Sequence, residues 1–92
     1  MRIAFYPSFY RSIKNLPVQE KEDIQAVLKQ TLDILAQDKF VHVGLGLKRL
    51  KEDYWEVRKG LKTRIIFRWR GDLVELFLAG DHDDVRRFLK SI

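Results

Sequence analysis

Apolar and polar residues alternate along residues 64–70 and 73–80, with the period of two that is typical of β-strands. Gly71-Asp72 separates the two segments and is a strong signal for a two-residue hairpin turn. A slip by one residue would carry arginines into the apolar face, so the pattern favours one register. That register pairs Trp69 with Val74, Phe67 with Leu76 and Ile65 with Leu78 on an apolar face, and Arg68 with Glu75, Ile66 with Phe77 and Arg64 with Ala79 on the opposite face.

A third strand, residues 54–58, precedes this hairpin and joins it through a loop at residues 59–63. With this loop, Arg58 lies opposite Arg64. Two arginines in direct opposition repel each other by roughly 0.2–1 kcal/mol, which a fold tolerates most readily where an anion lies between them. His82 follows the strand beside Arg64, so we expect these three side chains to converge on a phosphate-binding or catalytic end of the sheet. The alternative is that both arginines are solvated beside a turn.

The first 37 residues predict a strand followed by two helices. Residues 2–6 form a short strand that Pro7 ends, and Ser8 is a candidate N-cap for a short helix that breaks at residues 15–17. Apolar residues recur at helical spacing from about Val18 to Gln37, which predicts a longer second helix. We expect the two helices to form a hairpin that covers the apolar face of the sheet.

The remaining segments complete an α+β fold. Residues 38–46 predict a loop, and residues 47–51 predict a basic strand whose lysines suit the edge of a sheet. From about residue 83 to residue 91, apolar positions follow the i, i+3, i+4, i+7 rule of an amphipathic helix. The expected architecture is an N-terminal strand, a helical hairpin packed on a twisted, mostly antiparallel sheet, and a short C-terminal helix.

Composition narrows the functional classes. Ninety-two residues predict a single domain over residues 1–92, with little room for a buried cofactor, and we expect no cofactor. The chain has no cysteine, which excludes a disulfide framework and a thiolate zinc site and is consistent with a reducing cytoplasm, where we expect the protein. No segment approaches the roughly 20 apolar residues of a membrane span. The net charge of +5 favours a polyanionic partner, either nucleic acid or an acidic protein.

Asp81-His82-Asp83-Asp84 is the densest cluster of titratable groups. One interpretation is a helix start, with Asp81 or Asp83 as the cap. His82 is less well explained by capping, and a histidine near two arginines can act as a general acid or base near neutral pH. A metal site is a poor interpretation, because consecutive residues point in different directions and no second cluster stands at ligand spacing. We therefore expect no metal.

The order of these segments resembles the RelE/ParE superfamily of bacterial and archaeal toxins. The resemblance spans nearly the whole chain, and it rests on several short segments in a fixed order rather than on one motif. These segments are Leu47-Lys48-Arg49-Leu50, Trp55-Glu56-Val57-Arg58, Arg64-Ile65-Ile66-Phe67 and Leu78-Ala79-Gly80-Asp81-His82-Asp83-Asp84-Val85. The resemblance implies a small α+β toxin that either cleaves mRNA, usually on the ribosome, or inhibits DNA gyrase, and that pairs with an antitoxin encoded nearby.

The resemblance also implies roles for individual residues. Arg64 matches the family's phosphate-contacting arginine, Arg58 matches a basic position of the RNA-cleaving branch, and His82 falls near a catalytic histidine or arginine of some members. Lys48, Arg49 and Lys62 extend the basic surface as candidate RNA-binding residues. Glu56 departs from the pattern, since one branch has a lysine there, and the C-terminal tyrosine of that branch is missing from residues 85–92.

Three functional hypotheses follow. The first is a metal-independent endoribonuclease, in which the ribose 2′-OH attacks phosphorus, Arg58 and Arg64 stabilise the developing charge, and His82 transfers a proton. The second is a non-catalytic gyrase inhibitor, and the third is an orphan interaction domain that retains only antitoxin binding. The convergence of two arginines and a histidine favours the first, with mRNA, the ribosome and a hetero-oligomeric antitoxin as partners and no membrane.

Overall fold

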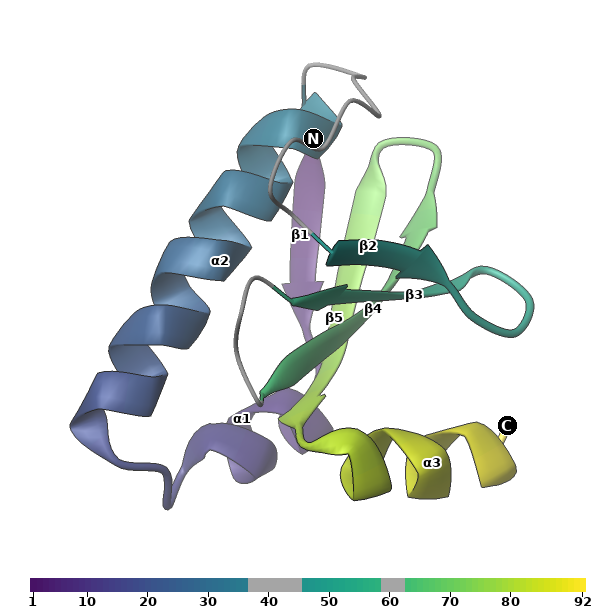
Figure 1. Cartoon of the computed structure of the whole chain (residues 1–92). Coiled ribbons are helices and arrows are strands. Elements are labelled where there is room, and N and C mark those ends of the chain that lie inside the picture. The colour runs from purple at the N-terminus through teal and green to yellow at the C-terminus, as the bar shows by residue number, and fades with distance from the viewer. Residues whose placement is uncertain (37–45, 59–62) are drawn as a thin grey trace.

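The computed structural model describes residues 1–36, 46–58 and 63–92. Its elements follow the order β1 (Arg2–Phe5), α1 (Pro7–Ile13), α2 (Val18–Ala36), β2 (Gly46–Arg49), β3 (Tyr54–Arg58), β4 (Arg64–Arg70), β5 (Leu73–Gly80) and α3 (His82–Lys90). The strands form one five-stranded sheet in the order β1-β5-β4-β3-β2. β1 runs parallel to β5, and every other neighbouring pair is antiparallel. The expected α+β architecture is confirmed, with β2 at one edge of the sheet (Figure 1).

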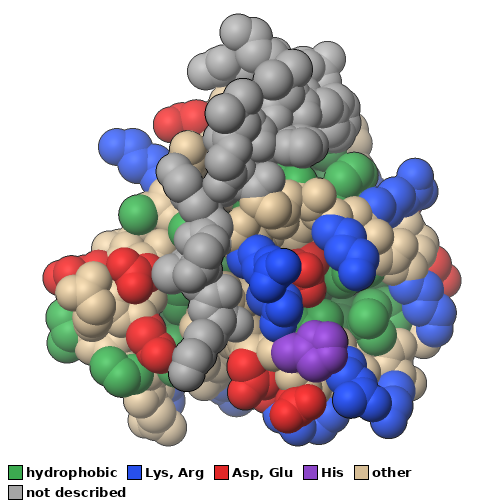
Figure 2. All heavy atoms as spheres, in the orientation of Figure 1, with side chains coloured by type: hydrophobic (Ala, Val, Ile, Leu, Met, Phe, Trp, Pro, Cys, Tyr) green, Lys and Arg blue, Asp and Glu red, His purple; other side chains and the backbone are tan. Residues whose placement is uncertain are grey.

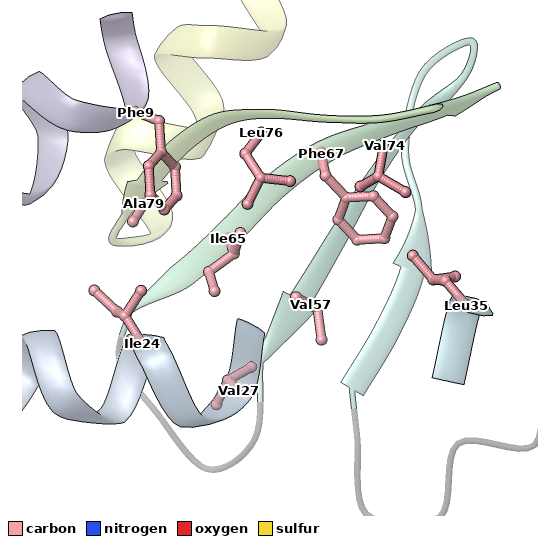
Figure 3. Packing of buried hydrophobic residues seen from close by; sticks show 10 residues of the cluster. All are labelled: Phe9, Ile24, Val27, Leu35, Val57, Ile65, Phe67, Val74, Leu76 and Ala79. Atoms are coloured by element: carbon pink, nitrogen blue, oxygen red, sulfur yellow. The ribbon is translucent and has the colours of Figure 1, made fainter. Parts of the chain in front are cut away.

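The helical hairpin of α1 and α2 covers one face of the sheet, as the amphipathic pattern predicts. Side chains from both helices pack against inward-facing residues of β3, β4 and β5 (Figure 3). Phe67 and Leu76 are 1% exposed and Val57 is fully buried, so this is the main core. Its buried members are Phe9, Ile24, Val27, Leu35, Val57, Ile65, Phe67, Val74, Leu76 and Ala79.

α3 packs on the opposite face of the sheet and forms a second, smaller core. Tyr54, Ile66, Phe77 and Val85 are its buried members. The ring of Phe88 lies 5.3 Å from the ring of Tyr54 and 5.9 Å from that of Phe77, measured between centroids. At the far end of the helix, Lys51 Nζ donates a hydrogen bond to the carbonyl of Ile92. The helix therefore runs from the end of β5 towards the turn between β2 and β3.

The register of the β4–β5 hairpin agrees with the sequence prediction near the turn and differs from it beyond a bulge. Trp69 pairs with Val74, Arg68 with Glu75 and Phe67 with Leu76, as predicted. A register shift then follows between Ile66 and Phe67, so the predicted pairs beyond it are wrong. The structure pairs Ile66 with Leu78, Ile65 with Ala79 and Arg64 with Gly80.

The bulge has a packing reason. An extra residue in one strand lets two consecutive side chains face the same side of the sheet. Here Phe77 and Leu78 both contact the core beneath α3, whereas the small Ala79 turns towards the helical hairpin. α3 thereby gains an apolar platform that strict alternation would not supply.

Two local predictions need correction. Ser8 is not the cap of α1: the N-cap is Tyr6, which makes no capping hydrogen bond, and Pro7 occupies the first turn, where its missing N–H costs nothing. The Ser8 hydroxyl instead donates to the carbonyl of Phe77 and ties α1 to β5. Gly46 belongs to β2 rather than to the preceding loop, whose residues 38–45 lie outside the described part of the chain.

Candidate functional site

A cleft of about 300 Å³ lies between the strands β2–β4 and the helix α3. Its lining combines basic and apolar side chains with one acidic residue. The lining residues are Gly46, Leu47, Lys48, Leu50, Glu56, Arg58, Arg64, His82, Val85, Arg86 and Leu89. Figure 2 shows one face of the molecule, on which the purple histidine lies among blue lysine and arginine side chains. The cleft thus brings together Arg58, Arg64 and His82, the three residues that the sequence predicted to converge.

Arg58 and Arg64 reach the cleft because of the β3–β4 register. The ladder ends with Val57 opposite Ile65, and the two arginines are the next residues beyond that pair on the two strands. Arg58 is exposed, and among the described residues it has no ion-pair partner. Gly46 permits the edge strand to approach here, because a Cβ at that position would lie 2.8 Å from the Arg58 carbonyl oxygen. Because Gly46 has no side chain, nothing on that residue covers the side chain of Arg58.

Arg64 is held by a carboxylate, which was not predicted from the sequence. Arg64 Nε lies 3.4 Å from Oε1 of Glu56, and the two side chains are 16% and 11% exposed. Glu56 lies on β3, the strand next to β4. It pairs with Lys48 of β2 on one side and with Ile66 of β4 on the other. Glu56 is the acidic residue among those that line the cleft, and it holds the guanidinium of Arg64 at the cleft wall.

His82 is the first residue of α3, and the aspartates around it form the start of the helix. The Asp84 amide donates to the Asp81 carboxylate at 2.9 Å, and the Asp81 amide donates to the Asp84 carboxylate at 3.0 Å. This capping box confirms the helix-start interpretation of the aspartates. The hydrogen bond from the Asp84 amide also holds the pKa of Asp81 below its ordinary value. His82 itself is exposed and takes no part in the cap.

No group of three or more acidic or histidine side chains in the described segments is placed to hold a metal ion. The aspartates at positions 81 and 84 are engaged by backbone amides, and Asp84 also pairs with Arg87. His42 lies outside the described residues. No helix in the described part of the chain is long and apolar enough to cross a membrane.

The predicted RNA-binding residues separate in the structure. Lys48 lines the cleft. Arg49 does not, since its Nε donates to the carbonyl of Glu52 in the β2–β3 turn. Lys62 lies outside the described residues. Two charged lining residues, Glu56 and Arg86, were not predicted as site residues. The spacing of Arg86 four residues after His82 could have placed these two on one helix face.

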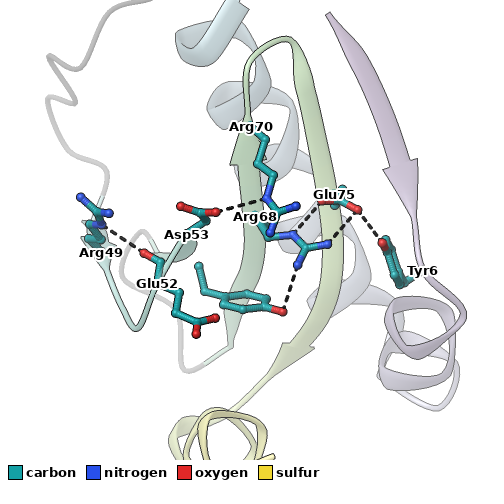
Figure 4. Close-up of polar contacts among 8 residues, drawn as sticks. Tyr6, Arg49, Glu52, Asp53, Arg68, Arg70 and Glu75 are labelled. Atoms are coloured by element: carbon teal, nitrogen blue, oxygen red, sulfur yellow. Dashed lines mark hydrogen bonds and ion pairs between the residues drawn. The ribbon is translucent and has the colours of Figure 1, made fainter. Parts of the chain in front are cut away.

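Other cations of the sheet are neutralised away from the cleft (Figure 4). Arg68 pairs with Glu75 through hydrogen bonds of 2.8 and 3.1 Å, and its guanidinium lies over the rings of Tyr54 and Phe77. The Tyr6 hydroxyl donates to the same carboxylate, and these bonds hold the pKa of Glu75 below its ordinary value. Arg70 pairs with Asp53. These arginines are structural, in contrast to Arg58 and Lys48 at the cleft.

Comparison with known proteins identifies the fold. The chain superposes on the toxin in the RelB–RelE antitoxin–toxin complex from Methanococcus jannaschii with a TM-score of 0.69 and 16% identity, over 92% of this chain and 96% of that one. It matches the E. coli DinJ–YafQ complex with a TM-score of 0.68 and 16% identity, over 92% and 98% of the two chains. A metal-bound toxin from Helicobacter pylori matches with a TM-score of 0.67 and 14% identity, over the same shares.

No known sequence family and no curated protein matches the sequence. At identities of 13–16%, the structural matches establish the fold, which is that of RelE- and YafQ-type toxins. The predicted resemblance is confirmed at this level. The chemistry of the cleft has to be argued from its own residues.

Proposed function

We propose that this chain is the toxin of a toxin–antitoxin pair and acts as a metal-independent endoribonuclease on mRNA. The observation that carries the proposal is the cleft, where Arg58 and Lys48, which have no ion-pair partner in the described part of the chain, surround one space together with the oriented Arg64 and the exposed His82. Such a site suits a phosphodiester, because arginines bind the phosphate oxygens and a histidine can transfer protons near neutral pH. The fold supports the proposal, since the similar solved structures include toxins bound to antitoxins.

The proposed reaction needs no external reactant. The ribose 2′-oxygen attacks the adjacent phosphorus and loses its proton, the bond from phosphorus to the 5′-oxygen breaks, and that oxygen takes up a proton. The products are a 2′,3′-cyclic phosphate and a 5′-hydroxyl. Arg58 and Arg64 would stabilise the charge that develops on the phosphate oxygens, and His82 would carry out one of the two proton transfers. DNA lacks the 2′-hydroxyl, so cleavage would be confined to RNA.

Cleavage of mRNA by the purified chain, with and without ribosomes, tests the enzymatic part of the proposal. We expect cut sites that end in cyclic phosphate, and we expect them to persist in excess EDTA, because the described residues offer no ligand cluster. Loss of activity in EDTA with recovery on addition of Mg²⁺ or Mn²⁺ would contradict the metal-independent mechanism. If no RNA is cut and DNA gyrase is inhibited instead, the gyrase hypothesis would replace the endoribonuclease.

The helical hairpin carries a second surface that suits the proposed antitoxin. A second cleft of about 340 Å³ is lined largely by apolar and aromatic residues of β1, α1 and α2. Tyr10 and Val18, which line this cleft, are 57% and 71% exposed, and exposed apolar side chains that gather around one groove mark an interaction surface. An amphipathic segment could cover this surface while acidic residues reach the basic cleft, and together these contacts would silence the toxin.

The antitoxin part is tested by co-expression with the neighbouring gene. We expect co-purification as a hetero-oligomer and relief of growth inhibition. A neighbour that neither binds the chain nor changes its effect on growth or RNA would contradict this part, and would favour an orphan interaction domain.

A further inference from the structure

Arg86 is a cleft residue with no assigned role. It lies four residues after His82 on α3, so the two side chains project from the same face of the helix. Four residues correspond to a rise of about 6 Å along the axis, which is comparable to the separation of successive phosphates along a nucleic acid strand. Both residues line the same cleft.

The charge of Arg86 is not neutralised by an acidic neighbour. Among the described residues it has no ion-pair or hydrogen-bond partner, whereas Arg87, the next residue, pairs with Asp84 and does not line the cleft. Two adjacent arginines on one exposed helix thus have different environments. Arg87 forms an ion pair at the start of the helix, whereas the charge of Arg86 is available to a ligand in the cleft.

The position of Arg86 separates it from the reacting centre. α3 begins beside Gly80, which pairs with Arg64, and it ends where Lys51 contacts the carbonyl of Ile92. Arg86 therefore lies further along the cleft than His82, in the direction of the β2–β3 turn. The apolar residues Leu50, Val85 and Leu89 also line the cleft, and apolar side chains can pack against the sugar or base that lies between two phosphates.

We propose that Arg86 binds the RNA phosphate next to the one that reacts. This inference rests on the endoribonuclease function proposed above and extends it, because it makes the substrate a strand of at least two successive phosphates. Arg86 acts in binding rather than in the chemical step, since it is displaced along α3 from Arg64 and His82. Its removal raises KM and leaves kcat close to that of the wild type.

The test is the binding of a short 2′-O-methyl oligoribonucleotide, which lacks the nucleophile and cannot be cleaved. Fluorescence anisotropy over a range of salt concentrations gives both the affinity and the slope of log K against log salt. For Arg86→Ala we expect about tenfold weaker binding. We also expect the slope to fall by about 0.7, the value for loss of one phosphate contact on a single strand. Arg86→Lys, which keeps the charge, should retain most of the wild-type slope.

Arg87→Ala and Lys90→Ala are the matched controls, because each removes one positive charge from the same helix outside the cleft. Both should bind with nearly the wild-type slope. If Arg86→Ala binds as these controls do, while the wild type binds RNA, the inference is overturned and the proposed function stands. If the wild type itself binds no RNA at low salt, this inference is overturned, and the cleavage assay with ribosomes decides separately whether the proposed function stands.

Discussion

Replacing Arg64 with alanine should reduce stability as well as activity, because the change leaves the carboxylate of Glu56 buried without its partner. At 3.4 Å, and with an effective dielectric constant of about 20, the attraction between the two charges is about 5 kcal/mol before desolvation is subtracted. Loss of one member of a buried pair typically costs about 3–5 kcal/mol. Glu56 keeps 11% of its side chain exposed, and Lys48 across the ladder can replace part of the attraction. We therefore expect a loss of about 2 kcal/mol.

A double-mutant cycle separates this structural effect from catalysis. Glu56→Gln removes the charge that Arg64→Ala would leave unpaired, so the double variant should recover about 1 kcal/mol relative to Arg64→Ala. Urea denaturation measures the free energy of unfolding of the four proteins, and thermal melts should show a difference of about 10 °C between wild type and Arg64→Ala. Activity should follow a different pattern, with cleavage reduced about 10²–10³-fold in both variants that lack Arg64.

Two results would refute this reasoning. An Arg64→Ala variant as stable as the wild type would mean that Glu56 does not depend on the ion pair. A double variant that regains cleavage would mean that the loss in Arg64→Ala came from misfolding or from the uncompensated carboxylate, and Arg64 would lose its proposed contact with phosphate.

Three further predictions concern the helix start and the sheet. His82→Ala should lower the cleavage rate by about 10²–10⁴-fold, and an unchanged rate would show that His82 takes no part in the reaction. The pKa of Glu75 in the folded state lies below its ordinary 4.5, so its hydrogen bonds with Arg68 stabilise the fold above pH 4.5, and this contribution is lost as the pH falls through the folded-state pKa. The free energy of unfolding of Glu75→Gln should therefore decline less steeply with acid than that of the wild type. Equal declines in the two proteins would contradict the assignment. Gly80→Ala should cost about 1–3 kcal/mol, because its Cβ would lie 2.6 Å from the Cβ of Asp84, and a wild-type melting temperature would show that α3 can shift freely.

The sequence predicts most of the fold where a strong periodic pattern meets an unambiguous turn. Gly71-Asp72 fixes the hairpin, and the pairs next to it are correct as far as Phe67 and Leu76. The second helix is predicted to within about one residue, because its apolar residues recur over five turns between tight boundaries. The proximity of Arg58 and Arg64 also follows from the pattern, since it depends on the end of the β3–β4 ladder, where the register is regular.

The bulge could not be predicted from the hairpin alone. The alternation of residues 73–80 is compatible with an unbroken strand, and the need for an extra apolar side chain arises from α3, which belongs to a different part of the chain. The local pattern therefore favoured Leu78 on the sheet face that the helical hairpin covers, whereas the packing of α3 places Leu78 on the opposite face. The ion pair between Glu56 and Arg64 was missed for a related reason, because it joins different positions of two neighbouring strands rather than residues directly opposite each other.

The same bulge connects the fold to the proposed site. Phe77 and Leu78 contact the core on which α3 rests, and the capping box at Asp81 fixes where the helix begins. A start one residue later would rotate every side chain of the helix by about 100° and would carry His82 and Arg86 away from the cleft together. The arginines of β3 and β4 are set by the sheet, whereas the residues of α3 are set by how β5 ends. Changes in the bulge should therefore reduce activity before they reduce the stability of the main core, because the two cores lie on opposite faces of the sheet and share no side chain.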